Sequence, residues 1–516
     1  MSTYYTSRKI RFNNAEQFKE SFSESVNPTV GYMFISNHIP YEDEEVIPEA
    51  YDTAVYEKSV WDNMIAAKKI TGTDLEYVIP NNLYANNVYY MQYDDTLNLE
   101  VLITGNVAQN IHSFYVVNSE NSVYKCLSNN NSSISTIEPT GYGEGTKGIV
   151  TTTDSYVWKY MYTVPEGNKF TTNTWIPAPV STNRLAYSAN TSHAVDGELI
   201  AIVVSNPGTN YYNGTINVSS FLSACSILTY DATTDVANTI AVNMELSGNG
   251  ITFGTYVTNI DTFNRQLILS YPTETRGGGS GNTISTLTRS VVVGDGFGAI
   301  CNTYISGNSV DKIVLTSFGE EYNYADVIIY GTGEDASARP ILGPKYGHSF
   351  NSAKELGCNT VLLNVEVQSS NNISSNTTFR QYGLLVNPHK YGESTPVLFA
   401  NAQSTISQTT NVTLLQLSGD FVETNKFVYQ GSVAEPSFSG VINEVLLEED
   451  TLKLTNVRGT IEIGPVLKTN ATSIAVSDIS YPEFQPYSGD ILHAKNIESI
   501  QRAAEQTENI KVIVKF

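Results

Sequence analysis

Residues 152–165 read Thr-Thr-Asp-Ser-Tyr-Val-Trp-Lys-Tyr-Met-Tyr-Thr-Val-Pro, the clearest strand pattern in the sequence. Successive side chains of a β-strand point to opposite faces, so alternate residues share a face. One face carries four aromatic side chains: Tyr156, Trp158, Tyr160 and Tyr162. The other carries Val157, Lys159, Met161 and Thr163. Each buried aromatic side chain removes roughly 150–250 Å² from water, so the aromatic face is expected to anchor either a sandwich core or a subunit interface.

Most of the chain beyond residue 70 continues in the same way. Short stretches rich in Val, Ile, Thr and Tyr are interrupted by Gly, Asn, Asp and Pro. This is the composition of strands separated by turns. The last six residues, 511–516, also alternate, and we expect them to pair within a sheet. The predicted fold class is therefore mostly β.

Two helices are predicted before residue 71. The first covers about 14–25, with Asn14 as its cap and with Phe18 and Phe22 on one face. The second begins after Asp52 and runs to about residue 70, because its apolar residues recur at helical spacing and Gly72 follows.

A repeat with an offset of 111 residues, from 202 to 313, lies within 202–329. The first copy is Ile202, Val204, Gly208, Tyr211, Gly214, Ile216 and Val218, and the second is Ile313, Leu315, Gly319, Tyr322, Ala325, Val327 and Ile329. Alternating apolar residues flank a glycine in both copies, which predicts a β-hairpin whose turn needs a positive φ. We therefore expect two similar sheets. Residues 276–281, between the copies, predict a flexible loop.

The charge of the chain limits its partners. The 516 residues include 29 Lys and Arg against 52 Asp and Glu, a formal net charge of −23. Nucleic-acid affinity comes largely from cationic side chains, so DNA and RNA are not expected as partners. The longest apolar run, Leu199–Val204, is far shorter than the roughly 20 residues of a membrane-spanning helix. Residues 1–5 do not resemble a signal peptide, so we expect the chain to fold in the cytoplasm.

No local motif indicates a catalytic, cofactor-binding or metal-binding site. Residues 141–148 are rich in glycine but lack the Gly-Lys-Ser/Thr order of a phosphate-binding loop. No Gly-x-Ser-x-Gly elbow is present. The histidines do not fall at metal-binding spacing: His38, His112, His193, His348, His389 and His493. The cysteines are too far apart for a zinc motif and are expected to be reduced: Cys126, Cys225, Cys301 and Cys358.

Acidic clusters are the remaining catalytic candidates. They lie at 42–45, 94–95, 320–321 and 448–450. Glycoside hydrolysis needs two carboxyl groups about 5–10 Å apart with unequal pKa values, and adjacency in sequence does not supply that arrangement. We expect each cluster to be a solvated turn. Binding of carbohydrate through exposed tyrosines stays open, because the 33 Tyr side chains suit stacking as well as cores and interfaces.

Several blocks of the sequence resemble one family, the dimeric baseplate wedge protein of T-even-type contractile-tailed bacteriophages. The blocks follow the family's order: 78–80 (Val-Ile-Pro), 124–127 (Tyr-Lys-Cys-Leu), 152–165, 175–179 (Trp-Ile-Pro-Ala-Pro), 379–388 (Phe-Arg-Gln-Tyr-Gly-Leu-Leu-Val-Asn-Pro) and 505–512 (Glu-Gln-Thr-Glu-Asn-Ile-Lys-Val). Colinear matches are more specific than any single one. The resemblance covers about 1–185, 379–392 and 488–516, a little under half of the chain.

The resemblance implies a layered antiparallel β-sandwich core with helix-bearing loops and inserted small β modules. The core is expected at 1–185 with 379–400 and 486–516. An inserted β region with the repeat is expected at 186–378. A small β-meander or barrel is expected at 401–485, where strand-like alternation is interrupted by acidic turns.

The resemblance also implies a structural role in the tail baseplate of the virion, after assembly in the host cytoplasm. The expected partners are a second copy of the chain, in a homodimer, and other baseplate wedge proteins. The family is structural, so no enzymatic activity and no catalytic, cofactor or metal residues are expected. One alternative is a carbohydrate-binding or depolymerising tail protein. Another is a receptor-binding adhesin, although such proteins usually show heptads or short fibrous repeats, which this sequence lacks.

Overall fold

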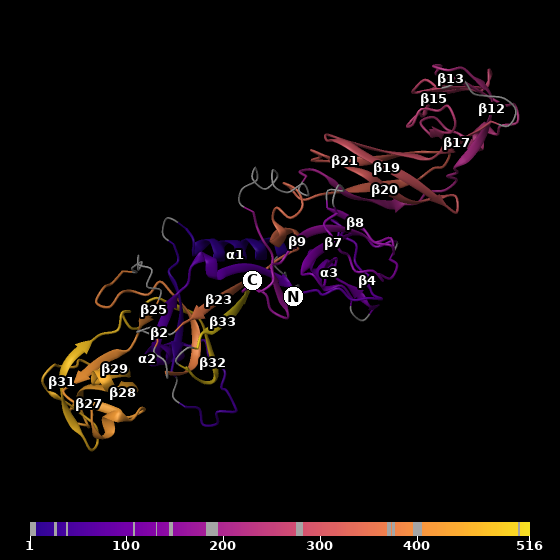
Figure 1. The fold of residues 1–516 in the computed structure, drawn as a ribbon. Coiled ribbons are helices and arrows are strands. Elements are labelled where there is room, and N and C mark those ends of the chain that lie inside the picture. Colours follow the sequence, from indigo (N-terminus) through magenta and orange to yellow (C-terminus); the bar gives the residue numbers. More distant parts are fainter. Residues whose placement is uncertain are drawn as a thin grey trace, which may run out of the picture. The chain divides into compact units, whose positions relative to one another are not determined.

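A computed structural model of the chain is mostly β, as predicted, with several antiparallel sheets and a closed barrel (Figure 1). It describes residues 7–24, 28–37, 40–106, 109–130, 132–143, 148–181, 195–274, 282–368, 373, 377–395, 405–503 and 506–516. The predicted loop at 276–281 lies outside these residues. None of the described helices is long and apolar enough to cross a membrane.

The chain forms two compact units. The first comprises 1–78 and 359–516, and the second comprises 79–358. The predicted core at 1–185 is therefore divided between the two units, and the predicted domain boundaries stay a prediction.

The first unit is built on a five-stranded sheet with the order β25-β2-β1-β24-β32. Its strands are β1 (Gly31–Ser36), β2 (Met64–Lys69), β24 (Thr378–Val386), β25 (Thr405–Ser407) and β32 (Asp490–Gln501). A second set of neighbouring strands is β3 (Leu75–Pro80), β23 (Thr360–Val367) and β33 (Glu508–Lys515). β33 contains the alternating C-terminal residues, so the prediction that they pair within a sheet is confirmed.

Both predicted helices exist with different bounds. α1 (Arg8–Ser21) begins earlier than predicted, because Ser7 is the cap: its Oγ accepts from the backbone N of Ile10 at 3.4 Å. Asn14 therefore lies inside the helix, and the capping prediction is wrong. The rings of Phe18 and Phe22 are in contact, as the spacing predicted, at 5.3 Å between centroids.

α2 (Ala54–Asn63) starts where predicted but ends early. The predicted helical continuation to residue 70 is wrong, because Met64–Lys69 forms β2, with β1 on one side and β25 on the other. Strand pairing on both edges outweighs the helical spacing of the apolar residues in this segment.

A closed six-stranded barrel follows β25, as the prediction of a meander or barrel at 401–485 allowed. Its strands are β26 (Thr410–Leu414), β27 (Phe427–Gly431), β28 (Pro436–Leu446), β29 (Thr451–Gly459), β30 (Val466–Lys468) and β31 (Ser473–Ser480), in the order β26-β29-β28-β27-β30-β31. Inward-facing side chains such as Val412, Ile442 and Leu452 are fully buried and form a core of their own.

The second unit contains a four-stranded sheet with the order β6-β7-β9-β8. Its strands are β6 (Tyr115–Val117), β7 (Ser122–Ser128), β8 (Ile149–Thr151) and β9 (Val157–Thr163). The shorter elements of this unit are β4 (Tyr89–Tyr90), α3 (Leu99–Thr104), β5 (Ile111–His112), β10 (Trp175–Pro177) and α6 (Ser352–Glu355).

Two copies of a three-stranded motif follow in the second unit. The first copy consists of β11 (Leu199–Asn206), β18 (Arg289–Gly294) and β19 (Phe297–Ser306), and the second of β20 (Ser309–Glu320), β21 (Ala325–Tyr330) and β22 (Ser337–Leu342). In each copy Gly-x-x-Tyr lies at or just after the end of the first strand, and Gly-x-Gly lies at or just after the end of the second. These residues are Gly208, Tyr211, Gly294 and Gly296, then Gly319, Tyr322, Gly331 and Gly333.

Equivalent residues of the two copies pair with each other. Ile202 of β11 is the register partner of Ile313 of β20, and Val291 of β18 is the partner of Ile328 of β21. When equivalent residues of two copies are antiparallel partners, a local two-fold axis passes between them. The turns follow the same symmetry: Tyr212 N donates to Thr332 Oγ1 at 3.1 Å, and Asn323 N donates to Asp295 Oδ1 at 2.9 Å. The sandwich is thus an internal duplication.

The prediction of two hairpins is wrong, because an inserted sheet interrupts the first copy of the motif. After Tyr211 the chain enters a six-stranded sheet of β14-β17-β12-β13-β16-β15, and it returns to the sandwich at β18. These strands are β12 (Gly214–Phe221), β13 (Ile227–Tyr230), β14 (Glu245–Ser247), β15 (Val257–Asp261), β16 (Gln266–Leu269) and β17 (Thr283–Leu287). β12 therefore pairs with β13 and β17 instead of β11. The predicted positive φ is confirmed, at 64° for both Gly208 and Gly319.

Replacing Gly319 by alanine is expected to destabilise the sandwich by about 3 kcal/mol. An added Cβ would lie 2.8 Å from both the backbone N of Ala299 and the backbone O of Phe297, at a φ of +64°. Gly307 is the matched control, because its φ is +56° with open space around the Cβ position. Gly307→Ala should cost only about 1 kcal/mol. Hydrogen-exchange protection of β19 and β20 measures both changes, and equal losses would contradict the packing argument.

Candidate functional site

The aromatic strand predicted at 152–165 is β9 and its preceding turn. Tyr156 and Trp158 are fully buried, and their rings stack at 5.4 Å with an interplanar angle of 18°. Tyr90 meets the Trp158 ring edge-on at 5.4 Å. Tyr160 and Tyr162 are only half-buried. The first two aromatic residues are therefore core, and this part of the strand anchors the β6-β7-β9-β8 sheet.

A buried network of charged side chains covers the opposite face of β9. Lys159 donates to Glu198 Oε1 at 2.8 Å, and Lys125, from β7, donates to Glu355 Oε1 at 3.0 Å. His348 lies between the two carboxylates: its Nδ1 contacts Glu355 Oε1, and its Nε2 lies 3.4 Å from Glu198 Oε1. Every one of these side chains is at most 4% exposed.

The surroundings hold this network in one arrangement. The backbone N of Ser349 donates to Glu355 Oε2 at 3.1 Å, and Lys125 Nζ lies 3.7 Å from the centre of the Tyr93 ring. Burial lowers the pKa of Lys125, although Glu355 opposes that effect. Burial also lowers the pKa of His348. Burial alone would raise the pKa of Glu355, but His348 and Lys125 lower it well below its usual range.

This network contains the residue types of acid–base catalysis, yet its geometry favours a structural role. None of its members lines the cavities of about 730, 500 and 260 Å³ that the described residues form. Its carboxylates are engaged by lysines and an imidazole, which is the pairing that buried charges require. The sequence could not reveal it, because its members are separated by up to 230 residues in one ion pair.

Stability of the second unit is expected to fall as the pH drops below about 6.5. With its folded pKa lowered, His348 stays neutral in the folded state, whereas the unfolded chain takes up a proton near pH 6.5. Because the pKa of Glu355 is also lowered, its contribution is present above about pH 4.5 and is lost at lower pH. Hydrogen-exchange protection factors of β7 and β9, measured from pH 7.5 to 4, test this. His348→Gln should flatten the dependence of stability on pH between about pH 6.5 and 5. An unchanged slope would contradict the role assigned to His348.

Three of the acidic clusters found in the sequence take part in ion pairs or turns. Asp94 and Asp95 both contact the Arg339 guanidinium, and Glu44 accepts from Arg380 Nε at 3.0 Å. The hydrogen bonds from Thr96 and Arg339 lower the pKa of Asp94 despite its partial burial. Glu448 and Glu449 lie in a short 3-10 turn (Leu447–Glu449) between β28 and β29, and Asp450 follows it. Each of these three clusters thus has a structural role as a turn or in an ion pair.

The other sequence candidates have ordinary surroundings. Cys126 and Cys358 are buried, Cys225 and Cys301 are half-buried, and all four are free thiols. No group of three or more His, Cys, Asp or Glu side chains is placed to hold a metal ion in the part of the chain that the structure describes. His38, His193 and residues 144–147 of the glycine-rich segment lie outside the described residues.

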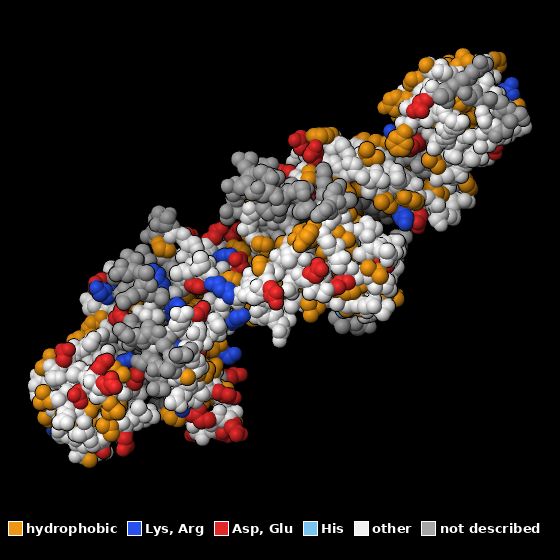
Figure 2. Space-filling view, viewed as in Figure 1, with side chains coloured by type: hydrophobic (Ala, Val, Ile, Leu, Met, Phe, Trp, Pro, Cys, Tyr) orange, Lys and Arg blue, Asp and Glu red, His pale blue; other side chains and the backbone are white. Residues whose placement is uncertain are grey.

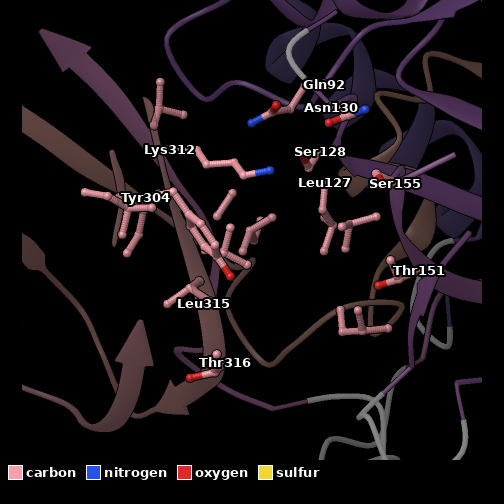
Figure 3. Close-up of a pocket in the computed structure, with 18 of the residues that line it drawn as sticks. Gln92, Leu127, Ser128, Asn130, Thr151, Ser155, Tyr304, Lys312, Leu315 and Thr316 are labelled. Atoms are coloured by element: carbon pink, nitrogen blue, oxygen red, sulfur yellow. The ribbon is translucent and has the colours of Figure 1, made fainter. Parts of the chain in front are cut away.

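A groove of about 730 Å³ lies between the β7-β9-β8 strands and the duplicated sandwich. Leu127, Ile149 and Val157 form one wall, and residues 200–204 and 311–318 form the other. Figure 3 shows Gln92 and Lys312 reaching into the space from opposite sides, with the Tyr304 ring beside them. Its titratable lining residues are Tyr304, Asp311 and Lys312. The groove lacks paired carboxylates, so its lining suits binding rather than hydrolysis.

Comparison with known proteins identifies no family. No protein-family model matches the chain, and no curated protein matches it either.

Proposed function

We propose that the chain is a structural subunit of a contractile-tail baseplate wedge, which forms a homodimer and connects neighbouring wedge proteins. The colinear resemblance of six sequence blocks to that family carries the proposal. All six blocks overlap strands: 78–80 lies in β3, 124–127 in β7, 152–165 contains β9, 175–179 contains β10, 379–388 covers most of β24, and 508–512 lies in β33. A resemblance located in strands concerns the framework of the protein rather than variable surface loops.

The modular construction of the chain suits such a role. The barrel, the duplicated sandwich and the inserted six-stranded sheet each have their own hydrophobic core. Large apolar side chains remain exposed on several of them, including Phe253 at 92%, Phe263 at 93% and Leu415 at 71%. Figure 2 shows hydrophobic side chains distributed among uncharged ones over the visible surface. In an assembly, partner subunits would cover such residues.

The oligomeric state tests the proposal directly. Multi-angle light scattering of the purified full chain should give a dimer at micromolar concentration. A reconstruction of the intact tail should place the chain in the baseplate. A strict monomer, or absence of the chain from purified tails, would overturn the proposal.

The depolymerase alternative is tested separately. Incubation of the full chain with host-surface polysaccharide should release no new reducing ends, because the acidic clusters form separate turns and ion pairs and the buried carboxylates of the second unit are engaged. Release of reducing ends would replace the structural proposal with an enzymatic one.

A further inference from the structure

A second cavity, of about 260 Å³, lies in the first unit beside the barrel. Most of its wall comes from α2 through Trp61 and Asp62, from β28 and β29 of the barrel, and from the segment 481–487 between β31 and β32. Tyr391, on the loop after β24, also lines it, as do Gln408, Thr410 and Ile461. The cavity is therefore assembled from elements far apart in sequence, and no local motif could indicate it.

Aromatic rings form one part of the wall. Tyr391 and Tyr481 lie parallel, with centroids 5.2 Å apart and an interplanar angle of 10°. They are 41% and 44% exposed, so both side chains remain accessible from solvent. Tyr487 is 50% exposed and meets the buried Trp61 ring at 6.5 Å. Exposed parallel aromatic rings of this kind offer flat apolar platforms.

Polar groups of fixed orientation lie beside the platforms. Arg458 makes a two-pronged contact with Asp62, and the Tyr487 hydroxyl donates to the same carboxylate. Gln485 accepts from the backbone N of Gly392 at 3.1 Å, and Asn456 donates to Asn63 at 2.7 Å. Within the described residues, the amide nitrogen of Gln485 and the amide oxygen of Asn456 make no hydrogen bond. They provide one donor and one acceptor.

Two wall residues have a positive φ, and one of them is a bulky tyrosine. Tyr487 has a φ of 62° and Asn456 a φ of 53°. A positive φ is uncommon for a residue other than glycine and is a clear outlier for a bulky one such as tyrosine. Asn456 also lies where the pairing of β28 with β29 shifts register. Irregularities of this kind re-aim side chains and cluster at binding sites.

We propose that this pocket binds one neutral hexose unit of a saccharide. A sugar ring has apolar C–H faces, which match the tyrosine platforms, and hydroxyl groups on its edge, which match the Gln485 and Asn456 amides. Among the described residues that line the cavity none is a lysine or arginine, and the carboxylate of Asp62 is already paired with Arg458. The wall therefore offers no cation to an acidic sugar. The net charge of −23 also works against a polyanionic ligand. This inference concerns binding alone and does not depend on the baseplate role.

Titration calorimetry of the full chain with neutral hexoses and their oligomers tests the site. Binding should be detectable, and Tyr481→Ala and Gln485→Ala should each weaken it by about 5- to 10-fold. Tyr324→Ala is the matched control, because Tyr324 is 64% exposed and lies outside the pocket; it should leave the affinity unchanged. Circular dichroism verifies that each variant is folded.

Three results would overturn the proposal. The first is no heat and no ligand-detected NMR signal with any neutral hexose. The second is binding that Tyr481→Ala and Gln485→Ala leave unaffected, which would place the sugar elsewhere. The third is a clear preference for a proline-rich peptide, which would identify the tyrosines as a polyproline platform instead.

Discussion

Trp158→Ala is expected to destabilise the β6-β7-β9-β8 sheet by about 3–5 kcal/mol. The indole is completely buried, and it packs against Tyr156 and Tyr90 at 5.4 Å in each case. Its strand partners in the sheet, Cys126 and Val150, hold it from both sides. Removal of the ring would leave a cavity that these neighbours cannot fill, because their own positions are fixed by the strand ladder.

The measurement has to be local, since a chain with several separate cores does not unfold in one step. Hydrogen exchange of β7 and β9, measured at increasing denaturant concentration, reports the loss of local stability. The barrel strands serve as an internal reference. Trp158→Phe should cost much less, because Nε1 of the indole has no hydrogen-bond partner among the described residues. Phe253→Ala, at a side chain that is 92% exposed, should have no effect. Equal stability of Trp158→Ala and wild type would contradict the assignment of Trp158 to the core.

The sequence predicts the surroundings of Trp158 well and those of Lys159 poorly. Alternation along one strand is a local property, so it correctly places Tyr156 and Trp158 on one face. It says only that Lys159 points the other way. Lys159 can be buried because it is paired with Glu198, which directly precedes β11 of a different sheet, and that contact depends on the tertiary structure.

The repeat shows the same difference between local features, which the sequence predicts, and tertiary contacts, which it does not. Two glycines with the same spacing to a tyrosine predict positive φ angles, because that requirement is set within a few residues. The partner of each strand depends on where the chain goes next. In the first copy, the chain passes through the inserted six-stranded sheet after Tyr211 and returns to the sandwich only at β18. The pseudo-two-fold axis, like the sugar pocket beside the barrel, arises from segments that only the folded chain brings together.

Lys159→Met is expected to destabilise the second unit by about 3–5 kcal/mol, because it leaves the Glu198 carboxylate buried without its cation. Glu198 is 2% exposed, and its Oε2 already has no hydrogen-bond partner in the described part of the chain. The exposed pair of Lys426 and Glu423, at 2.9 Å, is the matched control. Lys426→Met should cost less than about 1 kcal/mol, because solvent screens an exposed pair.

The double variant Lys159→Met/Glu198→Leu distinguishes two causes of a large destabilisation in Lys159→Met: an uncompensated buried charge and lost packing. If the loss in Lys159→Met comes from an uncompensated buried charge, removing the carboxylate as well should recover most of it, because an apolar pair of similar size fills the same space. If the loss comes from packing, the second substitution should add to it. Additive losses at pH 7.5 would show that the network stabilises the fold by shape rather than by charge pairing.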